Sequence, residues 1–363
     1  MLIVLFALAS VWILAYALVG EASLFRHWVN ALFPLGAFVA ITTVVAAESN
    51  YDVIDKSRYA VEFESLSFAS LPEAFYTART EGREPAFLLF NWLVGTITHD
   101  AHVFFLITAA LCSLMLATTL WVILGSGWQT AVVFYLTYCF GFFIDYSSFL
   151  LRQGLSISFL FLALALILRG AKRPWVILLL GIGVLFHWSS AVPAGLILLI
   201  AVMRLRTDIL VGVWTLFSLS YFTGLNSRLA EPLGSHIEQV ETYSDPALAQ
   251  SYAGGTNRPI FWVLSAGPLA FAYAARKRLD TLPEWYPKLL NAFLLLNCYY
   301  LCLGFVYFSD RLAAYSWSIV PVLVALPFLG WSGKGQRTVR LGMLMLFTGW
   351  AVYFGSFASL QPT

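Results

Sequence analysis

Charged side chains are scarce in this sequence. Only 11% of its 363 residues are Asp, Glu, Lys or Arg, whereas 60% are hydrophobic and 17% are aromatic. Soluble domains carry about 25% charged residues. No polar stretch is longer than about 40 residues, the low end of what folds alone. The composition excludes an ordinary soluble domain and predicts an all-α, polytopic integral membrane protein with a single transmembrane domain, 1–363.

Cysteine is also rare, and its pattern predicts neither a disulfide framework nor a metal site. All four cysteines lie in apolar runs, and Cys298 and Cys302 share a helical face without a histidine or carboxylate in the motif. The first apolar run, 1–20, lacks basic residues at its start and a clear small-residue cleavage site at its end. It is interpreted as a retained first span and not as a signal peptide.

Long apolar runs dominate what remains. About ten of them suit full crossings of a hydrocarbon core of about 30 Å: 1–20, 29–47, 101–124, 128–144, 149–168, 207–226, 259–275, 288–308, 312–330 and 341–357. Twelve of the 21 Lys and Arg residues fall in the connections 169–173, 204–206, 276–288 and 334–340. Positive charge marks the cytoplasmic side, so these connections are predicted to lie inside and both termini outside.

Two polar segments, about 48–84 and 227–258, are predicted to be loops on the outer side. The first carries eight acidic and four basic residues, and this acidic excess suits the non-cytoplasmic face. Planar and hydrogen-bonding groups that suit carbohydrate are provided by Asn50, Tyr51, Asp52, Tyr59 and Tyr76. A solvated acidic loop would have the same composition. In the second loop, 235–243 is expected to form a short surface helix.

The run 175–203 is too long for one ordinary span. As a single helix it would extend about 43 Å, and basic residues flank both ends. It is interpreted as a helical hairpin whose turn, 187–193, faces a cavity, because non-helical backbone at membrane depth needs such a setting. One tilted, proline-kinked helix with a packed His187 would explain the same residues. The shorter apolar segment 84–98 is interpreted as a second re-entrant segment, entering from outside.

Arg152 and Arg311 do not follow the pattern in which basic residues lie in the cytoplasmic connections. Each lies near the predicted outer start of a span, and an arginine that reaches the core costs about 2.5–3.5 kcal/mol. Guanidinium pairs with two oxygens at once and stays charged, which suits a diphosphate. Snorkelling of Arg152, or pairing of Arg311 with Asp310 or Glu84, would explain them without a ligand. With His187 and the Glu84 segment on the same side, they predict a shared outer cavity.

Four motifs in this order, EPAF, LLRQG, LFHWSSAV and DRLAAY, resemble the EpsG-type branch of the Wzy polysaccharide and O-antigen polymerases. The resemblance extends from about residue 52 to 315. It implies a GT-C-like glycosyltransferase of the bacterial inner membrane, with its active site facing the periplasm. Such an enzyme transfers a growing glycan from undecaprenyl diphosphate to the next lipid-linked repeat unit. It implies no cofactor and no metal, and the sequence has no Asp-x-Asp motif of metal-dependent glycosyltransferases.

Carried onto this chain, the resemblance assigns catalysis to Arg152 and His187 and, by a weaker match, to Arg311. The arginines would stabilise the leaving diphosphate. Histidine titrates near neutral pH, so His187 would accept the proton of the attacking hydroxyl. Glu84, also expected to be catalytic, or Asp310 could serve as the base instead, or hold an arginine in place. The expected substrate contacts are Gln153, Asp310, Trp188, Ser189, Tyr51, Asp52 and Arg258.

Two other functions stay open. An O-antigen ligase-like glycosyltransferase would use the same chemistry, but a larger outer loop would be expected before its histidine. A flippase or transporter of lipid-linked glycan would also have broken helices and buried charge, but no inverted repeat is visible. The expected partners are undecaprenyl-diphosphate-linked oligosaccharide, membrane lipids, and a chain-length regulator and flippase of the same pathway. No nucleic acid is expected.

Overall fold

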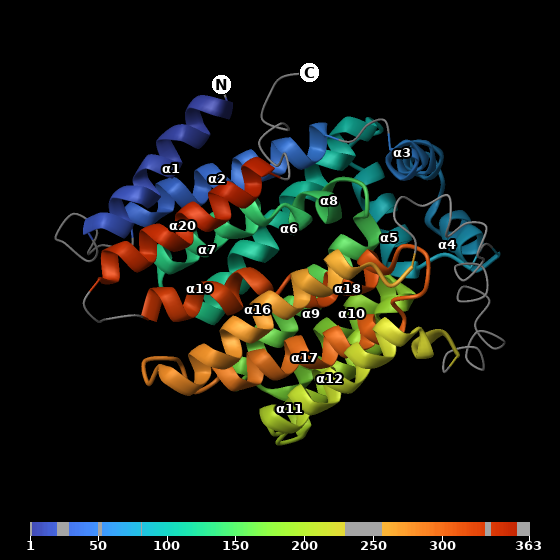
Figure 1. The fold of residues 1–363 in the computed structure, drawn as a ribbon. Helices are drawn as coiled ribbons and strands as arrows, with labels where there is room; N and C mark the ends of the chain where they lie inside the picture. Colours follow the sequence, from blue (N-terminus) through green and yellow to red (C-terminus); the bar gives the residue numbers. More distant parts are fainter. Residues whose placement is uncertain are drawn as a thin grey trace. The chain divides into compact units, whose positions relative to one another are not determined.

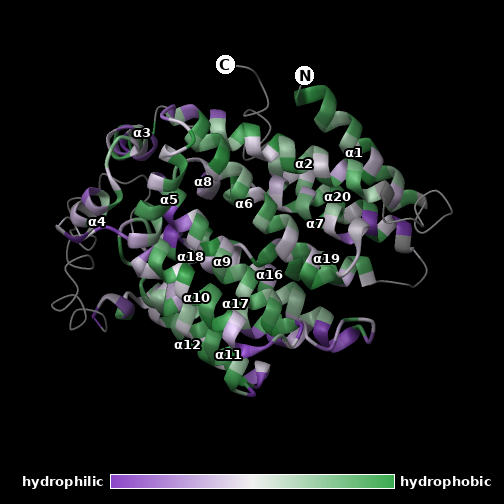
Figure 2. Cartoon of the chain, turned by 180° about the vertical axis from the view of Figure 1, so that it is seen from behind, coloured by the Kyte–Doolittle hydropathy of each residue, from purple (hydrophilic) through white to green (hydrophobic). Residues whose placement is uncertain are grey.

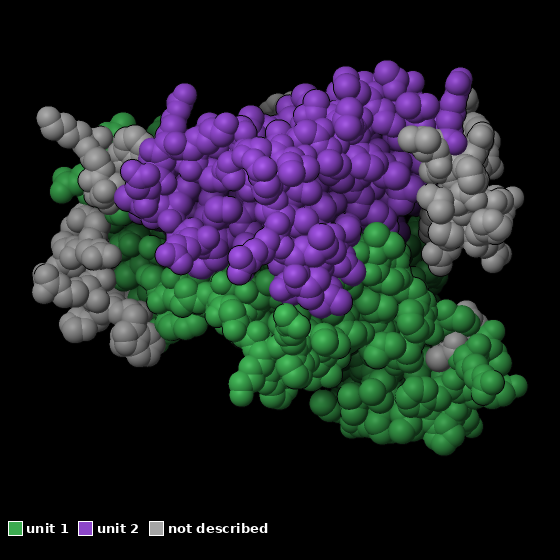
Figure 3. Space-filling model, turned by 90° about the horizontal axis from the view of Figure 1, so that it is seen from below, with its two compact units in different colours: residues 1–194, 331–363 green, residues 195–330 purple. Residues whose placement is uncertain are grey.

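The computed structural model describes residues 2–19, 29–49, 53–80, 82–228, 256–330 and 335–353. These ranges contain helices and connecting turns but no β-strand (Figure 1), which confirms the all-α class. The chain divides into two compact units, one of Met1–Ala194 and Trp331–Thr363 and the other of Gly195–Gly330 (Figure 3). The single transmembrane domain stays a prediction.

The helices of the first unit are α1 (Leu2–Val19), α2 (Val29–Glu48), α3 (Ile54–Ser67), α4 (Leu71–Thr80), α5 (Pro85–Gly95), α6 (Ala101–Leu124), α7 (Gly127–Phe140), α8 (Phe142–Ser148), α9 (Leu151–Leu168), α10 (Arg173–Phe186) and α20 (Gln336–Tyr353). A 3₁₀ turn, Trp188–Ser190, follows α10, and α11 (Ala191–Val202) continues into the second unit. The helices of the second unit are α12 (Thr207–Thr223), α16 (Pro259–Arg278), α17 (Tyr286–Cys302), α18 (Ser309–Trp317) and α19 (Val320–Gly330).

Several helical segments are long and apolar enough to cross a bilayer. Among the described residues there are four, Ala31–Glu48, Ala101–Leu124, Leu151–Leu168 and Ser309–Gly330, or five if the bent pair α7–α8 is one span. Hydrophobic residues predominate along these helices, and hydrophilic residues gather in connections such as those around α3 and α4 (Figure 2). The chain is therefore a membrane protein, as predicted. The ten full spans and the GT-C-like arrangement stay predictions.

The predicted span 128–144 is not one straight helix, because the chain bends by 79° between α7 and α8. That this bent pair crosses the membrane stays a prediction. The bend lies at Gly141, whose φ is 89°. A side chain with a Cβ disfavours this conformation, whereas glycine adopts it readily. After the bend, α8 packs against α9. The chain then continues into the LLRQG motif.

The polar segment 48–84, predicted as an outer loop, contains the helices α3 and α4. Its place on the outer side stays a prediction. One face of α3, formed by Lys56, Tyr59, Phe63 and Leu66, is buried at helical spacing. Its charged positions concealed this pattern in the sequence. α3 is seen nearly end-on where α2 is seen from the side (Figure 1), so α3 lies across the direction of α2.

α17 is the central helix of the second unit and contacts α12, α16, α18 and α19. Its Asn297 accepts a hydrogen bond from Trp214 Nε1 at 2.7 Å and donates to Ser265 Oγ at 2.8 Å and Ser316 Oγ at 3.0 Å. Such bonds satisfy polar groups that apolar surroundings would leave without partners. They join four helices of this unit.

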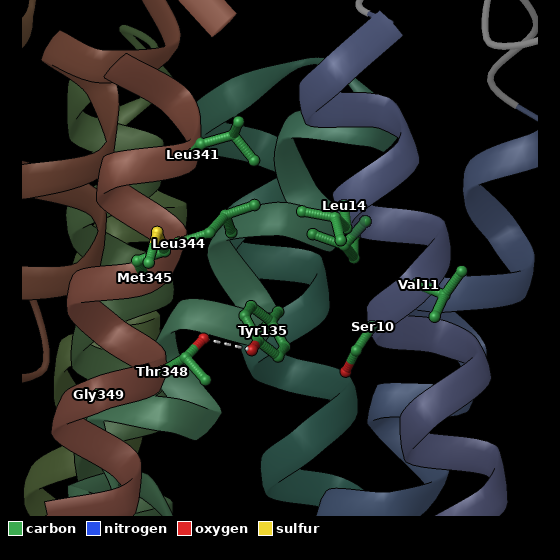
Figure 4. A pocket seen from close by; sticks show the side chains of 10 residues that line it. Ser10, Val11, Leu14, Tyr135, Leu341, Leu344, Met345, Thr348 and Gly349 are labelled. Atoms are coloured by element: carbon green, nitrogen blue, oxygen red, sulfur yellow. Dashed lines mark hydrogen bonds between the residues drawn. The ribbon is translucent and has the colours of Figure 1, made fainter. Parts of the chain in front are cut away.

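A cleft of about 470 Å³ opens in the first unit among α1, α7 and α20 (Figure 4). Its lining is mostly apolar, and the Tyr135 and Thr348 hydroxyls bond to each other at 2.8 Å. Each hydroxyl of this pair therefore has a hydrogen-bond partner within the cleft. None of the predicted site residues lines it.

Candidate functional site

The Glu84 carboxylate lies between Arg152 and His187. Its Oε2 accepts a hydrogen bond from Arg152 Nη1 at 2.8 Å, and its Oε1 lies 3.2 Å from His187 Nδ1. The Glu84 side chain is only 8% exposed, whereas those of Arg152 and His187 are 27% and 25% exposed. Together with Tyr59, which contacts Arg152, these residues form the Glu84 cluster, in which a buried anion holds a more accessible cation and imidazole.

Glu84 immediately precedes α5, whose first residue is Pro85. Proline favours the first position of a helix, because its fixed φ suits the helix and its missing N–H is not needed there. The backbone of Glu84 is extended, with φ −70° and ψ 122°, and its side chain does not cap the helix. The carboxylate is therefore available to the other members of the cluster.

Arg152 lies in the first turn of α9, and Gly154 determines how closely α9 approaches the end of α8. A Cβ at Gly154 would lie 2.0 Å from the carbonyl oxygen of Tyr146. Only glycine allows this approach. The glycine of LLRQG thus helps to place the arginine of the same motif.

His187 lies where α10 ends, in extended backbone with φ −159° and ψ 107°. Ser190 Oγ contacts the His187 carbonyl oxygen at 2.6 Å and the Gly183 carbonyl oxygen at 3.2 Å. These contacts hold the turn after the helix. The predicted interruption at His187 is present, whereas the hairpin stays a prediction because the chain enters the second unit at Gly195.

Tyr59 was predicted only as a carbohydrate-compatible residue of the outer loop and not as a site residue, yet it contacts the catalytic candidate Arg152. Arg152 Nε donates a hydrogen bond to Tyr59 Oη at 3.0 Å, and the guanidinium carbon lies 5.6 Å from the centre of the Tyr59 ring. The ring packs against Phe87 of α5, with centroids 5.4 Å apart. The helical spacing of Lys56, Tyr59 and Phe63 was the available signal.

Glu84 stays ionised at neutral pH. Burial opposes ionisation, but the His187 hydrogen bond and the Arg152 charge outweigh it and lower the pKa of Glu84 to about 2. An ionised carboxylate only accepts hydrogen bonds, so His187 Nδ1 carries the proton that Glu84 binds. The Nε2 atom of a neutral imidazole is then the proton acceptor.

Arg152 has N–H donors that its contacts with Tyr59 and Glu84 do not use. Of the five N–H groups of a guanidinium, Nε–H binds Tyr59 and one Nη1–H binds Glu84. The other three make no hydrogen bond to any described residue. An anion such as phosphate suits these donors, and it would bind near a proton acceptor.

The family model of EpsG matches residues 34–361. The chain belongs to the EpsG family. No curated protein and no solved structure matches it. Membership of the EpsG family indicates a polysaccharide polymerase-type function, a glycosyltransfer on lipid-linked glycans, and confirms the family resemblance that the four motifs indicated.

The structure brings Glu84, Arg152 and His187 of this EpsG-family chain together, whereas the shared outer cavity stays a prediction. Gln153 and Trp188 are their neighbours in the chain: Gln153 is 5% exposed and Trp188 is 45% exposed. Ser189, Arg258, Asp310 and Arg311 are each partly exposed.

Arg258, Asp310 and Arg311 belong to the second unit. The Arg258 guanidinium lies 4.5 Å from the Phe261 ring centre, and that of Arg311 lies 4.1 Å from the Phe308 ring centre. Tyr51, Asp52 and the predicted helix 235–243 lie outside the described residues of this EpsG-family chain. Within the described ranges, no three His, Cys, Asp or Glu residues are grouped as metal ligands.

Proposed function

We propose that this EpsG-family chain is a polysaccharide polymerase of the bacterial inner membrane. It transfers a growing glycan from undecaprenyl diphosphate to the next lipid-linked repeat unit at the periplasmic face. The observation that carries this proposal is the single Glu84 carboxylate bound to both Arg152 and His187. This cluster offers an anion-binding cation and a proton acceptor, the two groups that such a transfer needs.

The chemistry balances with these residues alone. The bond between the sugar C1 and the diphosphate oxygen breaks, and the diphosphate leaves with the electron pair. The acceptor hydroxyl forms the new C1–O bond and gives its proton to His187 Nε2. Arg152 stabilises the negative charge that develops on the leaving diphosphate.

Glu84 acts as the residue that orients the other two. Its low pKa, about 2, makes it a poor base, which favours His187 in that role. When His187 takes a proton, the carboxylate stabilises the imidazolium that forms. Arg311 is proposed as a second diphosphate ligand. The remaining predicted contacts to the glycan or diphosphate are Gln153, Trp188, Ser189, Tyr51, Asp52, Arg258 and Asp310.

The test is polymerisation by the purified protein in nanodiscs, with synthetic undecaprenyl-diphosphate repeat unit and a chelator. The expected result is a glycan ladder from wild type that is lost in Arg152→Lys and His187→Gln. Arg58→Met, on the exposed side of α3, is the matched control and should keep the ladder. Thermal melting shows that the inactive variants are folded.

Other outcomes would replace the proposal. A wild-type protein that makes no ladder but moves lipid-linked glycan between leaflets is a flippase. One that transfers finished glycan to lipid A core, without extending it, is a ligase.

A further inference from the structure

We propose that Lys56 and Tyr59, one turn apart on α3, are positioning residues for Arg152. Lys56 fastens α3 to the end of α2, and Tyr59 then holds the Arg152 guanidinium at the angle that diphosphate binding requires. This inference rests on the function proposed above for Arg152.

Lys56 is fully buried, with 0% of its surface exposed. Its Nζ donates hydrogen bonds to the carbonyl oxygens of Ala46 at 3.2 Å, Ala47 at 2.6 Å and Ser49 at 2.5 Å. The last carbonyls of an α-helix have no donor within the helix, and a cation is favourable at this end of the helix dipole. Lys56 therefore caps the C-terminal end of α2 from a different helix.

Burying a charged lysine costs free energy unless its ammonium group is paired or hydrogen-bonded. Burial lowers the pKa of Lys56 to about 8, with the charge of Glu48 acting in the opposite direction. The three carbonyl contacts and the Phe105 ring, whose centre lies 4.8 Å from Nζ, compensate for lost water. An apolar side chain would fill the space without this cost. What the ammonium adds is a directional attachment of α3 to α2.

Two further contacts keep α3 in register. Phe63 stacks on Phe104 of α6, with ring centroids 4.4 Å apart and planes 14° apart. At the C-terminal end of α3, a Cβ at Gly95 would lie 2.8 Å from the Ser67 Cα, so α5 packs closely against α3. Because Glu84 immediately precedes α5 and Tyr59 packs on Phe87 of α5, the same helix supports both partners of Arg152.

Tyr59 fixes the orientation of the Arg152 guanidinium, which the Glu84 hydrogen bond alone would leave free to rotate. Glu84 holds the guanidinium at Nη1 and Tyr59 holds it at Nε. A planar group bound at two of its nitrogens cannot rotate about either bond. Its other three N–H groups then stay in one orientation, which is the preorganisation that favours binding of an anion. Tyr59 is 6% exposed and acts through Arg152.

The test is a double-mutant cycle on binding of undecaprenyl diphosphate to the full chain in nanodiscs. The variants are Tyr59→Phe, Arg152→Lys and the double mutant. Tyr59→Phe removes only the hydroxyl. It is expected to weaken binding about 10-fold in the wild-type background, the order of one hydrogen bond to a charged group, and less than about 2-fold in Arg152→Lys. Such non-additivity identifies residues that act as a pair.

Lys56 is tested with Lys56→Met and Lys56→Arg. Lys56→Met should weaken binding as Tyr59→Phe does, and the two changes together should cost little more than either alone. Lys56→Arg keeps the charge and should recover part of the loss. Arg58→Met, the exposed cation on the same helix, should bind as wild type. Melting temperatures separate unfolding from loss of positioning.

Two results overturn the proposal while leaving the function intact: an unchanged affinity in Tyr59→Phe, or an equal loss in both backgrounds, which indicates a general structural role. A different result identifies failure of the function itself. If Arg152→Lys binds undecaprenyl diphosphate and polymerises as wild type does, Arg152 is not a diphosphate ligand, and the positioning role fails with it.

Discussion

His187 Nδ1 lies 3.2 Å from Glu84 Oε1, although the two residues are 103 positions apart in the sequence. Because the ionised carboxylate can only accept, this contact selects the imidazole tautomer and directs Nε2 away from Glu84. The same carboxylate holds Arg152 through its other oxygen. One buried charge thus holds both the guanidinium and the imidazole, which are the proposed diphosphate ligand and the proposed proton acceptor.

Glu84→Gln is expected to lower the polymerisation rate about 100-fold. The amide has nearly the same shape but loses the charge that binds both partners, and two charge-assisted hydrogen bonds are worth about 3 kcal/mol together. The polymerisation rate is measured as the rate of glycan-ladder formation. Glu64→Gln, an exposed change on α3, is the control. A Glu84→Gln enzyme with more than about a third of the wild-type rate would contradict the orienting role.

Glu84 also predicts how stability depends on pH. Its pKa falls from 4.5 to about 2 on folding, equivalent to about 3 kcal/mol. Since the folded pKa is the lower one, this stability is fully present above pH 4.5 and is lost as the pH falls through 2. Melting temperatures of wild type and Glu84→Gln should therefore converge between pH 4.5 and 2. Parallel curves over this range would refute the assignment.

Gly154→Ala should damage both fold and activity. The new methyl group would meet the Tyr146 carbonyl at 2.0 Å, so α8 and α9 must separate, at a cost of about 1–3 kcal/mol. Arg152 moves with α9, and affinity for the lipid diphosphate should fall as well. Melting and binding measurements check both effects.

Gly349→Ala is the matched control for Gly154→Ala. A Cβ there meets no atom within 4 Å, in the cleft of Figure 4, so the same chemical change should stabilise α20 by about 0.5–1 kcal/mol. Destabilisation by both substitutions would show that the tight α8–α9 contact is not the cause.

Ser190→Ala is expected to lower the turnover rate by about 5–10-fold with little change in diphosphate affinity. The hydroxyl holds the His187 carbonyl at 2.6 Å, and a neutral hydrogen bond contributes about 1 kcal/mol. Its loss should loosen the histidine but not Arg152. The turnover rate and the diphosphate affinity of Ser190→Ala are measured separately to test this. An equal fall in both would assign Ser190 a general structural role.

The sequence by itself determined the helical class, the membrane environment and three members of the Glu84 cluster. Hydropathy is a local property, so apolar runs such as 101–124 reveal their helices directly. Charge is costly in an apolar chain, and Arg152, Glu84 and His187 were therefore conspicuous. The motifs around them were enough to indicate the EpsG family.

Only the tertiary structure decided which of these residues touch and what supports them. The 79° bend at Gly141 depends on one residue in an otherwise uniform apolar run, and α3 was concealed because its buried face includes a lysine. Tyr59 meets Arg152 across 93 positions, and Lys56 caps a helix to which it does not belong. Such contacts arise from how α2, α3, α5 and α9 pack, because packing joins residues that no local pattern relates.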